Sequence, residues 1–93
     1  MTLSGSSAQS GIDQRKSVEL AVSEINANGG IQGLQGQRDL AFIVCDDKGR
    51  EDHVSAAATY LSRRGVPAIL GPLLSRLVET AAKEVAIPQG IFL

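Results

Sequence analysis

The sequence has few aromatic residues and almost no net charge, and both scarcities exclude functions. It contains no tryptophan, and its three aromatic side chains are Phe42, Tyr60 and Phe92. Proteins that bind single-stranded nucleic acid stack the bases on aromatic side chains. A formal net charge of −1 also provides no basic field that would attract DNA, RNA or an anionic membrane. We therefore expect no nucleic-acid partner.

Cysteine and histidine are equally scarce, since Cys45 and His53 are the only residues of their types. One cysteine can neither close an internal disulfide nor build a cysteine-based zinc site, so Cys45 is expected to fill space in the core. His53 adjoins an acidic cluster whose spacing does not match an EF-hand loop, namely Asp46, Asp47, Glu51 and Asp52. Carboxylates that favour a helix start are the simpler interpretation. We expect no metal, no cofactor and no catalytic triad.

Long apolar runs are absent as well. No stretch approaches the roughly 18 apolar residues of a membrane-spanning helix. The opening residues "MTLSGSSAQSG" lack the basic start and the apolar region of a signal peptide. The sequence thus predicts either a cytoplasmic protein or one whose targeting segment lies outside these residues.

The sequence does contain three apolar stripes with helical spacing. Its 93 residues, 43% of them hydrophobic, suffice for one small domain. The spacing predicts helices over residues 12–28, 52–63 and 75–86, with Pro88 stopping the third. The first ten residues and the stretch "GGIQGLQGQ" are predicted to be loops. The stripes consist of Val18, Ala21, Val22 and Ile25; of Val54, Ala57, Ala58 and Leu61; and of Val78, Ala81, Ala82 and Val85.

Short apolar runs between these helices predict buried strands. Residues 39–45, "DLAFIVC", are apolar on both alternating faces, as in a strand that is covered on both sides. The runs "VPAIL" and "GIFL" predict two further strands. Alternating helices and strands indicate an α/β fold with a doubly wound parallel sheet. Because such a sheet normally begins with a strand and this order begins with a helix, we expect a fragment that lacks its first, central strand and is cut at both ends.

Ser75 is the first candidate for a ligand-binding residue. It follows a break at Gly71-Pro72 and opens the third predicted helix. Ligands of doubly wound sheets bind outside the carboxyl ends of the strands, where a helix N-terminus offers unpaired N–H groups to an anion. A serine at this position is also a common helix cap, and both interpretations stay open on these residues alone.

The small-residue segment "LSGSSAQSG" is a second candidate for contact with a ligand. It lacks the glycine spacing and the lysine of a phosphate-binding loop. A solvated, flexible leader explains its composition equally well.

Three stretches together resemble a known family. They are "AVSEINANGGIQGLQGQ", "LAFIVCDDKG" and "RRGVPAILGPLLS". They are similar to the N-terminal lobe of type I periplasmic solute-binding proteins, in the leucine/isoleucine/valine-binding group of ABC-transporter receptors. The similarity runs from Leu3 to Leu93, and the glycine-rich helix end is its most specific part. It implies two doubly wound lobes joined by a hinge, with a ligand between them, and residues 1–93 as one incomplete domain within the N-terminal lobe.

The resemblance also implies roles for individual residues. Ser75 matches a serine that binds the ligand carboxylate through its hydroxyl and backbone N–H, and Leu74 matches a neighbour that lines the cleft. Ser10 matches a position that often carries an aromatic residue packed on the ligand side chain, and this departure counts against a standard aliphatic amino-acid pocket. The family's first strand would lie before Thr2, and further carboxylate ligands would lie beyond Leu93. The expected partners are an amino-acid-like carboxylate and, in the intact parent, a membrane permease, with a periplasmic or cell-surface location.

Two other functions remain open from the sequence. The lobe could belong to a cytoplasmic ligand sensor or regulator, or the residues could come from an unrelated doubly wound α/β enzyme. Against the enzyme, no G-x-G-x-x-G motif follows a predicted strand. Because two predicted strands lack the neighbour between them, we also expect the isolated chain to be marginally stable or to self-associate through unpaired edges.

Overall fold

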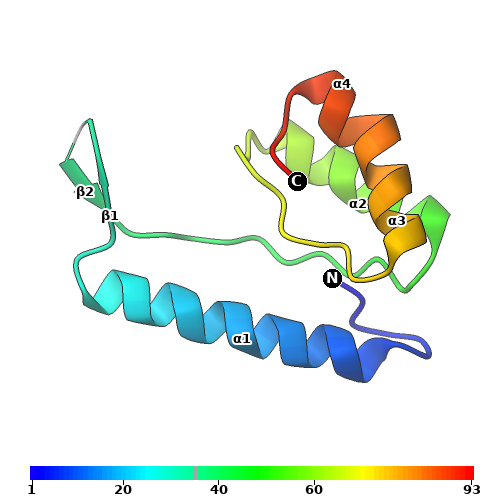
Figure 1. The fold of residues 1–93 in the computed structure, drawn as a ribbon, viewed down its shortest axis with the longest axis horizontal. Helices are drawn as coiled ribbons and strands as arrows, with labels where there is room; N and C mark the ends of the chain where they lie inside the picture. Colours follow the sequence, from blue (N-terminus) through cyan, green and yellow to red (C-terminus); the bar gives the residue numbers. More distant parts are fainter. Residues whose placement is uncertain (35) are drawn as a thin grey trace.

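The computed structural model describes residues 1–34 and 36–93, and helices dominate its regular structure (Figure 1). The elements follow in the order α1 (Ala8–Ala27), β1 (Ile31–Gly33), β2 (Gly36–Arg38), α2 (Glu51–Arg63), α3 (Ser75–Ala81), η1 (Ala82–Ala86) and α4 (Ile87–Gln89). None of the helices described here combines the length and the apolar character that crossing a membrane requires.

All three predicted helices are confirmed, with shifts at their ends. The first begins at Ala8 instead of residue 12, so the prediction of a loop over the first ten residues is wrong from Ala8 onward. The second begins at Glu51, where Glu51 and Asp52 lie in the first turn and favour the positive end of the helix dipole.

The third predicted helix does not stop before Pro88 but continues to Gln89. Proline lacks an N–H and its ring collides with the carbonyl four residues earlier in a regular α-helix. Here the turn before it widens into the π-helix η1, which replaces the regular hydrogen-bonding pattern at that point. Gly90 then ends the helix in the left-handed conformation, at φ 67°.

The hydrophobic core lies between α2 and the helix formed by α3 and η1. Its buried members are Val54, Ala58, Leu77, Ala81 and Val85, and the half-buried Ile69 and Leu74 pack against them. Four of the five belong to the predicted stripes, whereas Leu77 was not predicted. The stripe of α1 is different, because Val18 and Val22 are half-buried and Ala21 and Ile25 are exposed. Helix α1 therefore lacks a covering layer on its apolar side.

The predicted parallel sheet is present only as isolated pairings. Residues 39–45 and 66–71 are extended but form no regular strand, and the only parallel bridge recorded between described residues joins Ala68 to Phe92. The one regular sheet described is the antiparallel hairpin of β1 and β2, in a stretch predicted to be a loop. A strand needs a paired neighbour to be hydrogen-bonded, and the extended segments lack one on their facing sides.

Because the parallel sheet is incomplete, the chain is less compact than a complete domain of this length. In Figure 1, α1 lies on one side of the extended segment that follows β2, and the helices α2, α3 and α4 lie on the other. The Cα radius of gyration is 13.9 Å, compared with roughly 12 Å for a compact domain of this length. Helix α1 and the group formed by α2, α3 and α4 are therefore separated over part of their length.

We expect Leu77→Ala to destabilise the chain by about 2–5 kcal/mol, because truncation of a fully buried leucine leaves a cavity. Leu20→Ala is the matched control, since Leu20 is 62% exposed on α1 and its truncation should change the free energy of unfolding little. Urea denaturation followed by circular dichroism measures both. Equal losses for the two variants would contradict the assigned core.

Candidate functional site

The segments that precede α1, α2 and α3 meet at one end of the molecule, which we call the loop edge (residues 1–7, 46–50 and 71–74). The N-terminal ammonium of Met1 donates to the Cys45 carbonyl over 2.9 Å, and the Asp47 N–H donates to the Met1 carbonyl over 2.9 Å. On the other side of residues 46–50, Arg76 Nη2 donates to the Gly49 carbonyl over 2.8 Å. These bonds connect all three helix starts.

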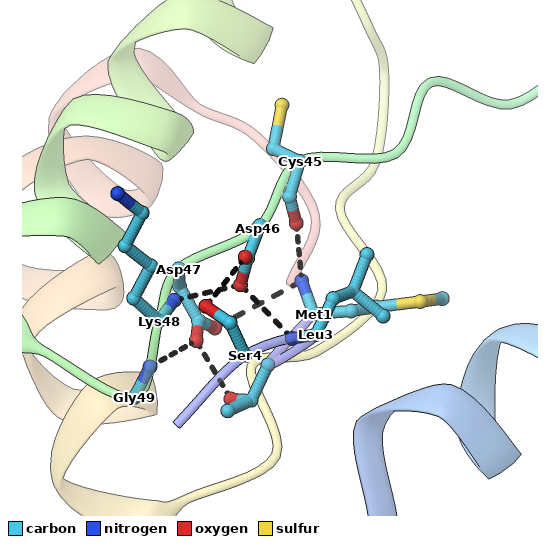
Figure 2. A network of polar contacts seen from close by, with 9 residues as sticks. Met1, Leu3, Ser4, Cys45, Asp46, Asp47, Lys48 and Gly49 are labelled. Atoms are coloured by element: carbon cyan, nitrogen blue, oxygen red, sulfur yellow. Dashed lines mark hydrogen bonds and ion pairs between the residues drawn. The ribbon is translucent and has the colours of Figure 1, made fainter. Parts of the chain in front are cut away.

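Asp46 holds the N-terminal segment at this edge (Figure 2). Its Oδ1 accepts from the backbone N–H groups of Leu3 and Lys48, both over 2.9 Å, and its Oδ2 accepts from Ser4 Oγ over 2.7 Å. Partial burial favours the protonated form, but these donors outweigh that effect and hold the pKa of Asp46 below its ordinary value. The carboxylate is therefore ionised at neutral pH and shielded by donors on several sides.

Asp47 makes the second half of this network and is itself buried, with 1% exposure. Its Oδ1 accepts from the hydroxyl of the buried Thr2 over 2.6 Å and from the Gly49 N–H over 2.9 Å. Its Oδ2 lies 3.8 Å from the Met1 ammonium, which forms the corresponding ion pair. The tandem aspartates thus attach four successive residues, from Met1 to Ser4, to the end of an extended segment more than forty positions away.

A glycine in α1 allows that helix to approach the attached segment. A Cβ added at Gly11 would lie only 1.6 Å from the Thr2 carbonyl oxygen, so no larger residue fits there without a shift. Gly11 is also the one buried residue of α1. The start of α1, and with it the segment Ser4 to Ser7, is therefore placed by backbone contact rather than by side-chain packing.

Ser75 lies at the first position of α3, as predicted, with its side chain exposed. Within the described residues its hydroxyl makes no hydrogen bond, and no side chain caps α3. The Leu74 carbonyl accepts from the N–H groups of Leu77 and Val78, which leaves the N–H groups of Ser75 and Arg76 as the free donors of the first turn. The capping role considered for this hydroxyl is therefore not observed, and the hydroxyl and two N–H groups are available to a ligand.

The other two predicted site residues lie apart from this group of donors. Leu74 immediately precedes Ser75, but its side chain is half-buried and packs against the core. Ser10 lies on α1, not in a loop, and is exposed. No hydrogen bond within the described part of the chain joins Ser10 to Ser75. The structure thus brings Leu74 and Ser75 together, while Ser10 is on a different helix.

The acidic residues that the sequence raised as a metal candidate have other partners. Asp46 and Asp47 belong to the network above, and Asp52 pairs with Arg50 over 3.1 Å. Across residues 1–34 and 36–93, no group of three or more His, Cys, Asp or Glu side chains is arranged to hold a metal ion. From the sequence we did not predict that Asp46 and Asp47 bind the N-terminal segment. The one sequence feature that could have indicated it is the pair of hydroxyl residues Thr2 and Ser4, which can donate to carboxylates.

Comparisons with known proteins show which family the chain resembles. A family model described as periplasmic binding protein matches residues 1–92. Among solved structures, the chain is similar to the branched-chain amino acid transporter substrate binding protein LivJ from Streptococcus pneumoniae strain Canada MDR_19A, solved in complex with isoleucine. The sequences are 32% identical, the TM-score is 0.85, and the match covers 96% of this chain but 24% of LivJ. Curated proteins include no match to the chain.

We expect Asp46→Asn to destabilise the chain at pH 7 and to have progressively less effect in acid. The folded-state pKa of Asp46 lies below its ordinary value, so its contribution is present above the ordinary value and is lost as the pH falls through the folded-state pKa. Urea denaturation of both chains from pH 7 to about pH 3 measures the difference.

Asp39→Asn is the matched control, because Asp39 is exposed and has no hydrogen bond or ion pair within the described residues. It should leave the stability nearly unchanged at every pH. An Asp46→Asn effect that stays constant or grows toward acid would contradict the role assigned to the ionised carboxylate.

Proposed function

The chain belongs to the periplasmic binding protein family, and we propose that it forms part of the lobe with which an ABC-transporter receptor binds amino acids. The observation that carries this proposal is the similarity to LivJ, at 32% identity over 96% of this chain, because that protein was solved with isoleucine. In this proposal residues 1–93 are an incomplete N-terminal lobe and act by binding, without catalysis.

Ser75 supports the proposal locally and is its central residue. A carboxylate at the loop edge would receive hydrogen bonds from the Ser75 hydroxyl and from the N–H groups of Ser75 and Arg76, which have no other partner among the described residues. The positive end of the helix dipole favours the same charge. The nearby Asp46 carboxylate is already surrounded by donors, which reduces its repulsion of an anion.

Leu74 and Ser10 have smaller parts in the proposal. Leu74 is the residue directly before the first turn of α3. Its side chain packs against the hydrophobic core and would form the inner wall of the site. Ser10 would face the aliphatic part of the ligand with a small polar group. The chain spans about a quarter of LivJ, so the ammonium partner and the opposite wall would come from other residues, and closure of a cleft needs both walls.

In its intact form the receptor is proposed to lie in the periplasm or at the cell surface and to deliver its amino acid to a membrane permease. The family assignment supports the location, and the role of LivJ as a transporter substrate binding protein supports the delivery to a permease.

Titration of the ¹⁵N-labelled chain with L-isoleucine tests the proposed function. We expect weak binding, with a Kd on the order of millimolar because one wall is present, and amide shifts concentrated at Ser75 and Arg76. Isoleucinamide, which lacks the carboxylate, should produce much smaller shifts at the same concentrations.

Ser75→Ala should weaken this binding by about 1–3 kcal/mol, the effect of removing a hydrogen bond to a charged partner. Ser23→Ala is the matched control, since Ser23 is an exposed serine of α1. The carboxylate site would be wrong if both variants bind alike or if isoleucinamide shifts the same amides.

A further inference from the structure

Helix α1 ends at Asn28 in a turn that is built on two glycines. The Gly29 N–H donates to the Asn26 carbonyl over 3.1 Å, and the Gly30 N–H donates to the Ile25 carbonyl over 2.9 Å. Both glycines have positive φ, at 98° and 78°. These two hydrogen bonds are those of the Schellman motif, which commonly places a glycine after the capping residue. Asn28 is therefore followed by a residue that has no side chain.

An asparagine followed by glycine is prone to a reaction with its own backbone. The backbone nitrogen of the glycine attacks the side-chain carbonyl carbon of the asparagine and forms a C–N bond. The side-chain nitrogen leaves as ammonia, which takes up the proton that the attacking N–H loses, and a five-membered succinimide remains. Water then opens the ring at either carbonyl and gives aspartate or isoaspartate. Because glycine lacks a Cβ, it hinders the closure of the ring least.

The two reacting residues lie at the surface of the chain. Asn28 and Gly29 are both exposed, and the nearest atoms to a Cβ added at Gly29 belong to the flexible side chain of Gln37, at 3.3 Å. In the closed turn Asn28 Nδ2 donates to the Glu24 carbonyl over 2.9 Å. This bond and the hydrogen bond of the Gly29 N–H must open before the ring closes. Helix ends open at little cost in free energy, so the reaction follows the opening of the last turn.

Asn26 is protected at each point where Asn28 is not. It is half-buried, its Nδ2 donates to the Leu40 carbonyl over 2.9 Å, and its Oδ1 accepts from the Leu40 N–H over 2.7 Å. The next residue is Ala27, which lies within α1 and carries a Cβ. The bonds to Leu40 also attach the last turn of α1 to the segment after β2. They therefore oppose the opening that the reaction of Asn28 requires.

We propose that Asn28 is a site of spontaneous deamidation and that the attachment of Asn26 to Leu40 limits its rate. The Gly29 nitrogen is the nucleophile, Asn28 Cγ is the carbon attacked, and water is the only other reactant. The site lies at the opposite end of α1 from the loop edge (Figure 1). The inference is therefore independent of the proposed amino-acid site.

The products change the end of α1 in two ways. A carboxylate at position 28 loses the hydrogen bond to the Glu24 carbonyl and places a negative charge at the negative end of the helix dipole. Isoaspartate also adds one atom to the backbone between residues 28 and 29, so the Schellman hydrogen bonds lose their geometry. A Cβ added at Gly30 would lie 2.1 Å from the Arg38 carbonyl oxygen, which shows how closely the turn contacts β2. A displaced turn therefore displaces the hairpin of β1 and β2.

Incubation of the chain in mildly alkaline buffer, followed by tandem mass spectrometry, tests the proposal. The tryptic peptide of residues 17–38 contains both Asn26 and Asn28. We expect the mass gain that accompanies replacement of the amide NH₂ by OH to appear at Asn28 and not at Asn26. The variant Asn28→Gln keeps the amide but would have to close a larger, less favourable ring, so position 28 should stay unmodified. Amides of Gly30 and Leu40 should exchange faster in the aged chain than in the fresh chain.

A second pair of variants tests the control by Asn26. Asn26→Ser removes both hydrogen bonds to Leu40 at similar helix propensity, and we expect it to accelerate deamidation of Asn28 several-fold. Ser23→Asn is the matched control, because it makes the reverse exchange at an exposed position of the same helix and should leave the rate unchanged. A synthetic peptide of residues 24–32 has no attached helix end and provides the rate of the unrestrained reaction.

The proposal is overturned if Asn28 stays unmodified while the peptide of residues 24–32 is fully converted, or if Asn26 gains mass as fast as Asn28. It is also overturned if Asn26→Ser and Ser23→Asn give the same rate at Asn28, because the attachment to Leu40 then has no part in the reaction.

Discussion

The attachment of the N-terminal segment to residues 45–49 is the interaction on which the rest of the structure depends. Two adjacent carboxylates, Asp46 and Asp47, accept hydrogen bonds from Leu3, Ser4 and Thr2 and from the turn that leads into α2. Hydrogen bonds to charged groups are worth more than neutral ones, and several act here on residues far apart in sequence. Together with the two backbone hydrogen bonds of Met1, they place the start of α1 beside the start of α2. Without these contacts the loop edge, and with it the surroundings of Ser75, would lose its geometry.

This attachment contrasts with the sparse apolar packing elsewhere. The buried core joins α2 to α3 and η1, whereas α1 contributes only Gly11 to the buried residues. Contacts at its two ends secure α1: the close backbone approach of Gly11 to Thr2 at one end, and the two hydrogen bonds of Asn26 with Leu40 at the other. Between these ends, Val18 of its apolar stripe lines the apolar cavity beside residues 40–43 and 66–70.

The sequence predicted the features that depend on local spacing and missed those that depend on distant partners. Apolar residues three and four apart predicted all three helices, and the position of Ser75 at a helix start was correct. The start at Ala8 was missed because small polar residues hide the helical pattern there. The β1–β2 hairpin has no alternating apolar pattern, so the glycines suggested only a loop. The network of Asp46 joins residues more than forty positions apart, which no local pattern can reveal. The resemblance to solute-binding proteins was confirmed at the level of the family, while the roles of Ser75, Leu74 and Ser10 stay predictions.

Residue-by-residue hydrogen exchange of the chain alone tests the central claim most directly. The account predicts protected amides at Asp47 and Ile69, which donate to the Met1 and Phe92 carbonyls, and unprotected amides at Ala41, Ile43 and Ala68, which have no hydrogen-bond partner among the described residues. Rapid exchange at Asp47 would contradict the attachment at the loop edge, and protection of the second group in the monomeric chain would contradict the absence of a neighbouring strand.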